Sequence, residues 1–437
     1  MGLNRICETW YFAPHDDPVN NEKELIIVLI LDNIINERNL QTTQIPKMSI
    51  QFIKRLTVLT ITCIFLVACR QEDDENKRDI LLAENNKIDL IFYQNDTETK
   101  AEFELGLKWA FSFLGARLER GSWDRAMVWQ SPTTFQINML ELGFNQNAAE
   151  QLENLIRQFK ISEEYLVKGG IDAGRFVVCT LNNSNHYYKI VGMPTSFNKY
   201  VSSKSFLQKR GAIIESAVAL KERLIQLPEE NSPINRLSYL AEELSGSLRD
   251  SSHQVLENEV MDVMENGQLR FGVYDTLGQL IVGSDPTISI AGKPVKCLWC
   301  HETAIQRGFA ALTSIPGYYS PAQFDSIIDK NSLTLDAYRK GLDTEIDFAD
   351  PSNHTKVEKL YFRFMEPSAN RLSLEWGVSV NEVELLLKDI ETHGHHEFPS
   401  FGQLYYRTEI EKFSPYATLP STSSIRETNI NEPNLLP

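Results

Sequence analysis

Two cysteines and a histidine lie close together in the segment Cys297-Leu298-Trp299-Cys300-His301. Thiols and imidazoles are the side chains that bind zinc, form redox-active disulfides and hold haem groups. With 6 Cys and 8 His among 437 residues, a CxxCH pattern arises by chance on the order of once in a thousand such sequences. This segment is therefore the most specific chemical signal in the chain.

The CxxCH pattern resembles the haem-attachment site of c-type cytochromes. The resemblance implies that Cys297 and Cys300 form thioether bonds with the two vinyl groups of one haem c, and that His301 is the proximal ligand of its iron. Two thiols three positions apart on one helical turn can reach the same macrocycle. The resemblance covers these five residues only, and no fixed motif marks the ligand on the distal side of the iron.

Met365 is the leading candidate for the distal ligand, because it lies among the aromatic residues of segment 361–367 and a thioether is a common axial ligand in cytochromes c. The alternative is that Met365 only fills the core, as a methionine on an apolar helix face often does. A vacant sixth position also remains open. The other candidates are His354 and the cluster His393, His395 and His396.

Other chemistries of the two cysteines remain open. A structural zinc site needs four ligands, and Cys179 with scattered histidines would have to complete it. A thioredoxin-like pair is expected in a βαβ context, which the surrounding pattern lacks. A plain disulfide is possible in an oxidising compartment. Zinc or a disulfide would make the protein a non-enzymatic binding module. A peroxidase-type haem enzyme would need a polar distal pocket, of which the sequence gives no sign. His186 and His253 are expected to be structural or surface residues.

The segment from Met48 to Cys69 has the order of a bacterial export signal. A basic start with Lys54 and Arg55 precedes an apolar run that is short for a bilayer span. Its end, Leu66-Val67-Ala68-Cys69, resembles the lipobox of bacterial lipoproteins, which implies lipidation of Cys69 and cleavage just before it. We therefore expect a lipid-anchored protein of the cell envelope, facing the periplasm or the cell surface. Bacterial haem c attachment also takes place outside the cytoplasmic membrane, so the two motifs agree.

Residues 1–47 precede this signal, and we interpret them as an over-long reading frame with translation starting at Met48. Residues 48–68 are then the signal peptide. Residues 69–78 form an acidic tether, which resembles the surface-export signal of some bacterial lipoproteins.

Composition excludes some partners. The chain is 42% hydrophobic and carries a net charge of −16, so it is globular and a poor electrostatic match for nucleic acid. Segment 370–383 resembles a helix-turn-helix, but two basic residues are too few for DNA binding, and we interpret it as a packed helical hairpin. The membrane contact we expect is the lipid anchor at Cys69. The redox partner protein cannot be inferred.

The predicted fold class is α+β, with a small α+β N-terminal domain followed by a mainly helical haem-c domain. Residues 79–195 form the first domain, with strands at 87–93 and 134–142, helices at 98–116 and 147–159, and a hairpin of 175–181 with 187–192. Residues 196–285 are predicted to be a helical linker region, with a helix ending before Gly267 and then a hairpin of 268–274 with 279–282. Residues 286–417 are mainly helical, with helix starts at Ser320-Pro321 and Glu366-Pro367 and a capping box at Ser379–Glu382. Residues 418–437 are a disordered tail.

Together these patterns predict a membrane-anchored, extracytoplasmic lipoprotein with one haem c. Its expected role is electron transfer rather than catalysis, with the haem as a one-electron relay.

Overall fold

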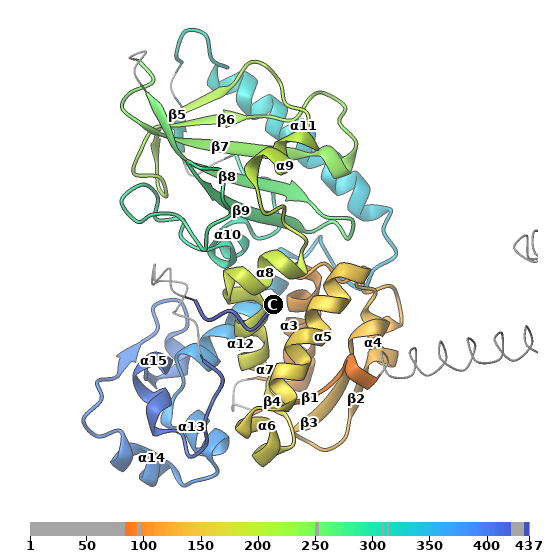
Figure 1. Ribbon diagram of the computed structural model, residues 1–437, viewed down its shortest axis with the longest axis vertical. Helices are drawn as coiled ribbons and strands as arrows, with labels where there is room; N and C mark the ends of the chain where they lie inside the picture. Colours follow the sequence, from red (N-terminus) through yellow and green to blue (C-terminus); the bar gives the residue numbers. More distant parts are fainter. Residues whose placement is uncertain are drawn as a thin grey trace, which may run out of the picture. The chain divides into compact units, whose positions relative to one another are not determined.

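The computed structural model describes residues 84–93, 98–249, 253–307, 310–312, 314–420 and 432–436. The predictions for residues 1–83, including lipidation at Cys69, lie outside these ranges. The described chain is mixed α+β, with its sheets interspersed with helices (Figure 1). The predicted fold class is therefore confirmed at this level.

The first sheet has the strand order β2-β3-β1-β4. β1 (Lys87–Ile91) pairs antiparallel with β3 (Thr134–Asn138) and parallel with β4 (Ile171–Asp172), and β2 (Met127–Trp129) lies at the edge. Its helices are α3 (Lys100–Phe113), α4 (Ser122–Ala126), α5 (Gln146–Lys160) and α6 (Glu163–Lys168). The strands predicted at 87–93 and 134–142 and the helices at 98–116 and 147–159 are confirmed, although a 3-10 helix at Met139–Leu142 replaces the end of the second strand.

The hairpin predicted for 175–181 and 187–192 is wrong. The segment forms α7 (Ala173–Val177), a π-helix (Val178–Asn182) and α8 (Ser184–Ile190). Asn183 is not in a hairpin turn but caps α8, because its side-chain oxygen accepts a hydrogen bond from the His186 amide at 3.1 Å. Most of these residues are buried, so the helices show no amphipathic period that the sequence could reveal.

The second sheet is antiparallel, with the order β10-β5-β6-β7-β8-β9. The strands are β5 (Gly211–Ser216), β6 (Arg223–Gln226), β7 (Ser238–Ser245), β8 (Gln254–Val263), β9 (Leu269–Asp275) and β10 (Ala310–Leu312), and α9 (Phe197–Ser202) precedes them. The helical prediction for the region up to residue 267 is therefore wrong. Gly267, at φ +83°, lies in the turn from β8 to β9. The predicted strand from 268 is confirmed as β9, with β8 as its main partner. The predicted turn back along 279–282 is also present, with the bridge between Tyr274 and Leu280 and the hydrogen bond from Ile281 N–H to the Val273 carbonyl at 2.9 Å.

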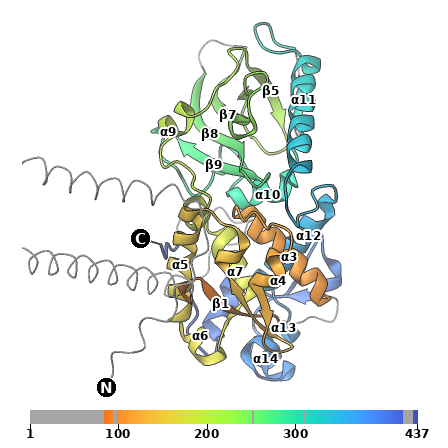
Figure 2. The same cartoon turned by 90° about the vertical axis from the view of Figure 1, so that its right-hand side faces the viewer.

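Two helices lie over one face of this sheet. The long helix α11 (Pro321–Lys340) runs alongside the strands in both views (Figures 1 and 2), and the short helix α10 (Pro294–His301) lies near the end of β9. α11 begins at the predicted site, with Ser320 as its N-cap and Pro321 in its first turn. Its Phe324 ring packs so closely on Gly211 of β5 that no Cβ would fit there. The apolar residues of α10 and α11 belong to the same hydrophobic core as these strands. The CxxCH segment therefore shares a core with the strands.

The remaining helices are α12 (His354–Met365), α13 (Ala369–Trp376), α14 (Val380–Leu386) and α15 (Arg407–Ile410), with a small sheet of β11 (His393–Gly394) and β12 (Gln403–Leu404). The capping box at Ser379 and Glu382 is confirmed. So is the helical hairpin, with Gly377 in the left-handed conformation at its turn. The helix predicted near Pro367 begins slightly later, after the N-cap Ser368. Short 3-10 helices lie at Ile234–Arg236, Pro351–Asn353, Pro399–Phe401 and Glu411–Phe413.

A set of buried charges joins α13 and α15 to α6 and α7, and we call it the ion-pair cluster. Arg407 binds Glu375 through two hydrogen bonds of 2.7 and 2.9 Å. Arg175 binds Glu164 at 2.6 Å, and Arg371 pairs with Asp172. All six side chains are at most 7% exposed. Within this cluster, the pair of Arg371 on α13 and Asp172 on β4 joins the C-terminal helices to the first sheet.

The disordered tail predicted for residues 418–437 is wrong where the structure describes it. Glu432 forms a buried ion pair with Lys293, at the start of α10. The backbone N–H of Leu435 donates to His186 Nε2 at 2.8 Å, and Leu436 is 4% exposed. These contacts attach residues 432–436 to α8 and α10. Among the helices that the structure describes, none is long and apolar enough to cross a membrane.

Candidate functional site

Helix α10 presents the CxxCH residues on one face and apolar residues on the other. Cys297, Cys300 and His301 are spaced i, i+3, i+4, which places them on one side of a helix. Val295, Leu298 and Trp299 have the same spacing on the other side and are at most 7% exposed. The Trp299 ring packs 6.2 Å from Phe113 of α3 and 6.1 Å from Tyr361 of α12. The apolar face therefore holds α10 in place. The face that carries Cys297, Cys300 and His301 is directed at the second sheet.

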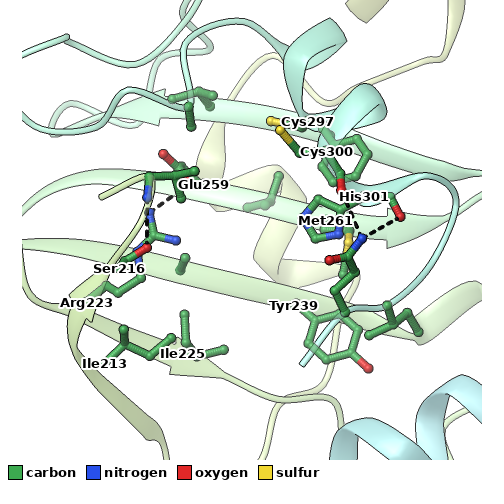
Figure 3. Close-up of a pocket in the computed structure, with 18 of the residues that line it drawn as sticks. Ile213, Ser216, Arg223, Ile225, Tyr239, Glu259, Met261, Cys297, Cys300 and His301 are labelled. Atoms are coloured by element: carbon green, nitrogen blue, oxygen red, sulfur yellow. Dashed lines mark hydrogen bonds and ion pairs between the residues drawn. The ribbon is translucent and has the colours of Figure 1, made fainter. Parts of the chain in front are cut away.

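The chemical face of α10 opens on a cavity between the second sheet and helices α10 and α11 (Figure 3). The cavity has a volume of about 170 Å³ and is open to solvent at its mouth. This is smaller than a typical ligand pocket of roughly 300–1,000 Å³, so a large ligand would extend through the mouth. Its walls are mostly apolar. They include Ile213, Ile225, Tyr239, Ala241, Val260, Met261, Phe271, Val273, Phe324 and Ile328.

His301 has one ring nitrogen committed to the backbone. Its Nδ1 lies 3.2 Å from the carbonyl oxygen of Ala304, and because a carbonyl only accepts, Nδ1 carries the proton and donates it. The lone pair is then on Nε2, the arrangement of histidines that ligate metals. Burial lowers the pKa of His301, so the imidazole is neutral at neutral pH. The ring packs 5.1 Å from the ring of Phe271, which lines the cavity.

A strained turn after His301 holds this geometry. Glu302 and Thr303 both have positive φ, at 47° and 65°, a conformation that costs a non-glycine residue about 1–2 kcal/mol. Arg339 of α11 supports the turn by donating to the carbonyl of Thr303 at 2.7 Å and to that of Gly267 at 2.9 Å. Gln306 donates to the carbonyl of Cys300 at 2.9 Å. The turn brings Ala304 back against His301.

The two thiols differ from a redox-active pair. Cys297 and Cys300 are free and half-buried, and both line the cavity. Burial raises the pKa of both thiols, whereas reactive cysteines have a lowered pKa and often lie at a helix N-terminus. Cys297 lies in the middle of α10 and Cys300 in its last turn, so neither is at the helix N-terminus. The two thiols therefore lack the features of a reactive thiolate.

Charged residues occupy the other end of the cavity. Arg223 of β6 pairs with Glu243 and, at 3.3 Å, with Glu259. Its Nε is buried and has no hydrogen-bond partner. Desolvation raises the pKa of Glu243 to about 8, and the negative charge of Glu259 adds to this rise. Figure 3 shows Arg223 and Glu259 at one end and His301 with Tyr239 at the other.

The structure brings Cys297, Cys300 and His301 together at the cavity but does not bring Met365 there. Met365 ends α12, is 2% exposed and belongs to the hydrophobic core. It does not line the cavity. This geometry supports the alternative that Met365 fills the core.

The histidine candidates have other partners. His354 Nε2 lies 2.8 Å from Glu358, and His393 Nε2 lies 2.8 Å from Glu366. His395 Nδ1 accepts hydrogen bonds from two backbone amides at 3.1 Å. His396, like these three, does not line the cavity. His186, with its Nδ1 2.8 Å from the carbonyl of Cys179, is structural, as expected.

A zinc site at the cysteines gains no support from the described residues, where no group of three or more His, Cys, Asp or Glu side chains is arranged to hold a metal ion. Cys179 lies beside His186 at 3.6 Å, away from the cavity wall.

Most of the sheet side of the cavity was missed because β5 to β8 were predicted to be helical. The signal that could have revealed it lies in β8, whose Met261 is paired with Phe271 of the predicted strand β9.

We compared the chain with models of protein families, curated proteins and solved structures, and none of the three comparisons found a match.

Proposed function

We propose that the protein is a membrane-anchored, extracytoplasmic lipoprotein that carries one haem c and transfers electrons. The observation that carries the proposal is the pairing of the CxxCH motif with an apolar cavity on the same face of α10. The haem would lie in this cavity and not in a separate helical domain, as the sequence had suggested.

Three features of the site fit a haem. Cys297 and Cys300 are free thiols, and an S–H group adds across a vinyl double bond without losing any atom. His301 has its Nδ1 proton held by Ala304, which leaves Nε2 for the iron. Arg223 is a buried cation with an unpartnered Nε and could pair with a haem carboxylate. When bound, the haem would supply one-electron chemistry, and the protein would supply the imidazole of His301 and the apolar surroundings.

Lipid anchoring rests on the signal and lipobox resemblance at residues 48–69, outside the described residues. Labelled fatty acid should enter the wild type and not the variant Cys69→Ala. Equal labelling of both would contradict the anchor while leaving the haem proposal intact.

The haem proposal is tested with the mature chain made alongside a cytochrome c maturation system. The wild type should keep haem stain after denaturing electrophoresis, because thioether bonds survive unfolding. Cys297→Ser combined with Cys300→Ser should abolish the stain, while Cys179→Ser, as the matched control, should keep it. A wild type with no visible absorption and one bound zinc would overturn the proposal in favour of a binding module.

A further inference from the structure

A methionine other than Met365 lines the cavity, on a strand within the second sheet. Met261 lies on β8, and its direct neighbours across the strands are Tyr239 on β7 and Phe271 on β9. Residues paired in this way point to the same face, with Cβ atoms about 4.5–5.5 Å apart. Although it sits in a central strand, Met261 is only half-buried, because its side chain lines the cavity.

Met261 and His301 lie at the same end of this cavity. The ring of Phe271 packs 5.1 Å from the His301 ring, and Met261 is the residue opposite Phe271 in the strand register. Figure 3 draws the side chains of Met261 and His301 next to each other, with the charged pair of Arg223 and Glu259 at the far end. The sheet and α10 thus supply a thioether and an imidazole from two walls of one cavity.

The other potential iron ligands of the cavity are engaged or unsuited. Glu259 binds Arg223 and accepts a hydrogen bond from Ser284 at 2.9 Å. Lys296 donates to the carbonyl of Ile290. Desolvation raises the pKa of Tyr239, so its phenol keeps its proton.

We infer that Met261 is the distal ligand of the haem iron, opposite His301. This inference rests on the proposed haem function and deepens it. A thioether is a soft ligand that favours the ferrous state and raises the reduction potential. The unbranched side chain of methionine can adjust its torsions when a macrocycle enters the cavity. Because Met261 lies on a strand that is paired on both sides, its backbone is held in place.

The test compares two methionines in the haem-loaded full chain. Oxidised wild type should show the weak far-red absorption band of sulfur–iron coordination. Met261→Ala should lose the band, lower the reduction potential and bind added imidazole at least tenfold more tightly. Met365→Ala is the matched control and should keep all three wild-type properties. Met261→Leu keeps the apolar bulk but cannot ligate, so it should behave like Met261→Ala even if the alanine variant folds poorly.

The outcomes separate the inference from the haem proposal. If wild type and variants all lack covalent haem, the proposed function fails. If all carry haem but Met261→Leu keeps the far-red band, or Met365→Ala loses it, the assignment of Met261 is overturned while the haem function stands. A wild type that carries haem without the band would also overturn it.

Discussion

The cavity and the ion-pair cluster both contain buried charges, yet they use them differently. In the cluster, Arg407, Arg371 and Arg175 each pair with a carboxylate, and Arg407 binds both oxygens of Glu375. Arg223 lines the cavity together with Glu259, and it is shared between Glu259 and the buried Glu243. The cluster is enclosed by packed helices, whereas Arg223 faces empty space.

This difference separates a structural use of charge from a functional one. Arginines of the cluster also stack on aromatic rings, with Arg407 4.1 Å and Arg175 4.7 Å from the ring of Phe364. Buried charges that pair within packed helices fix one arrangement of the helices. Arg223 instead lines a cavity, where a ligand can reach it. The cavity, and not the cluster, is therefore the candidate functional site.

The largest effect on stability is expected in the cluster. Arg407→Ala leaves Glu375 buried without its bidentate partner, and breaking a buried pair in this way costs about 3–5 kcal/mol. The free energy of unfolding, measured by denaturant titration, should fall by that amount. Haem content per folded molecule should not change.

The matched control is Arg125→Ala, which removes an exposed ion pair with Glu141 and should cost about 0–1 kcal/mol. Equal losses for the two variants would contradict the structural role of the cluster.

A second, smaller effect concerns pH and Glu243. The pKa of this carboxyl is raised to about 8 by desolvation, so the folded state holds its proton more tightly than the unfolded state. Its contribution to stability is therefore fully present below pH 4.5 and is lost as pH rises towards 8. Glu243→Gln cannot ionise, so its stability should fall less between pH 5 and 8, by a few kcal/mol at most.

Melting curves across this pH range measure the effect. Glu242→Gln is the control, because Glu242 lies on the opposite face of the same strand and pairs with Arg210. If wild type and Glu243→Gln have parallel pH profiles, Glu243 ionises normally and burial does not raise its pKa.

The smallest effect is expected at Arg339, which supports the turn after His301. Arg339→Ala leaves the buried carbonyls of Thr303 and Gly267 without a donor, at about 1–3 kcal/mol. Since this turn also holds His301, the haem spectrum of the variant should change. Arg339→Lys keeps the charge but lacks the guanidinium fork, so both changes should be smaller. An unaltered spectrum with lowered stability would show that the turn does not position His301.

Local patterns predicted the elements that are amphipathic or clearly capped. The helix α5 shows its apolar face in the sequence, and α11 and α14 show their caps at Ser320 and Ser379. The strand β7 was missed because Leu240, Ala241 and two glutamates are good helix formers. Pairing with β6 and β8 overrides that preference.

The site was predictable only in part for a related reason. Cys297, Cys300 and His301 are adjacent in sequence, so their spacing carries the signal. The cavity wall comes from β5 to β9 and from α11, and no sequence period links Met261 to His301. Met365 was favoured by its aromatic neighbours, but these neighbours form the core of α12, which packs against α3 and α10.

The position of Trp299 has an optical consequence. Its indole lies between the two cysteines in the sequence but on the opposite face of α10, against Phe113 and Tyr361. A haem bound to Cys297 and Cys300 would be less than a helix diameter away, about 10–12 Å, and would absorb the emission energy of this tryptophan. Fluorescence from Trp299 would then report haem occupancy without an added label. In the variant Trp299→Phe, the difference in emission between loaded and unloaded protein should shrink.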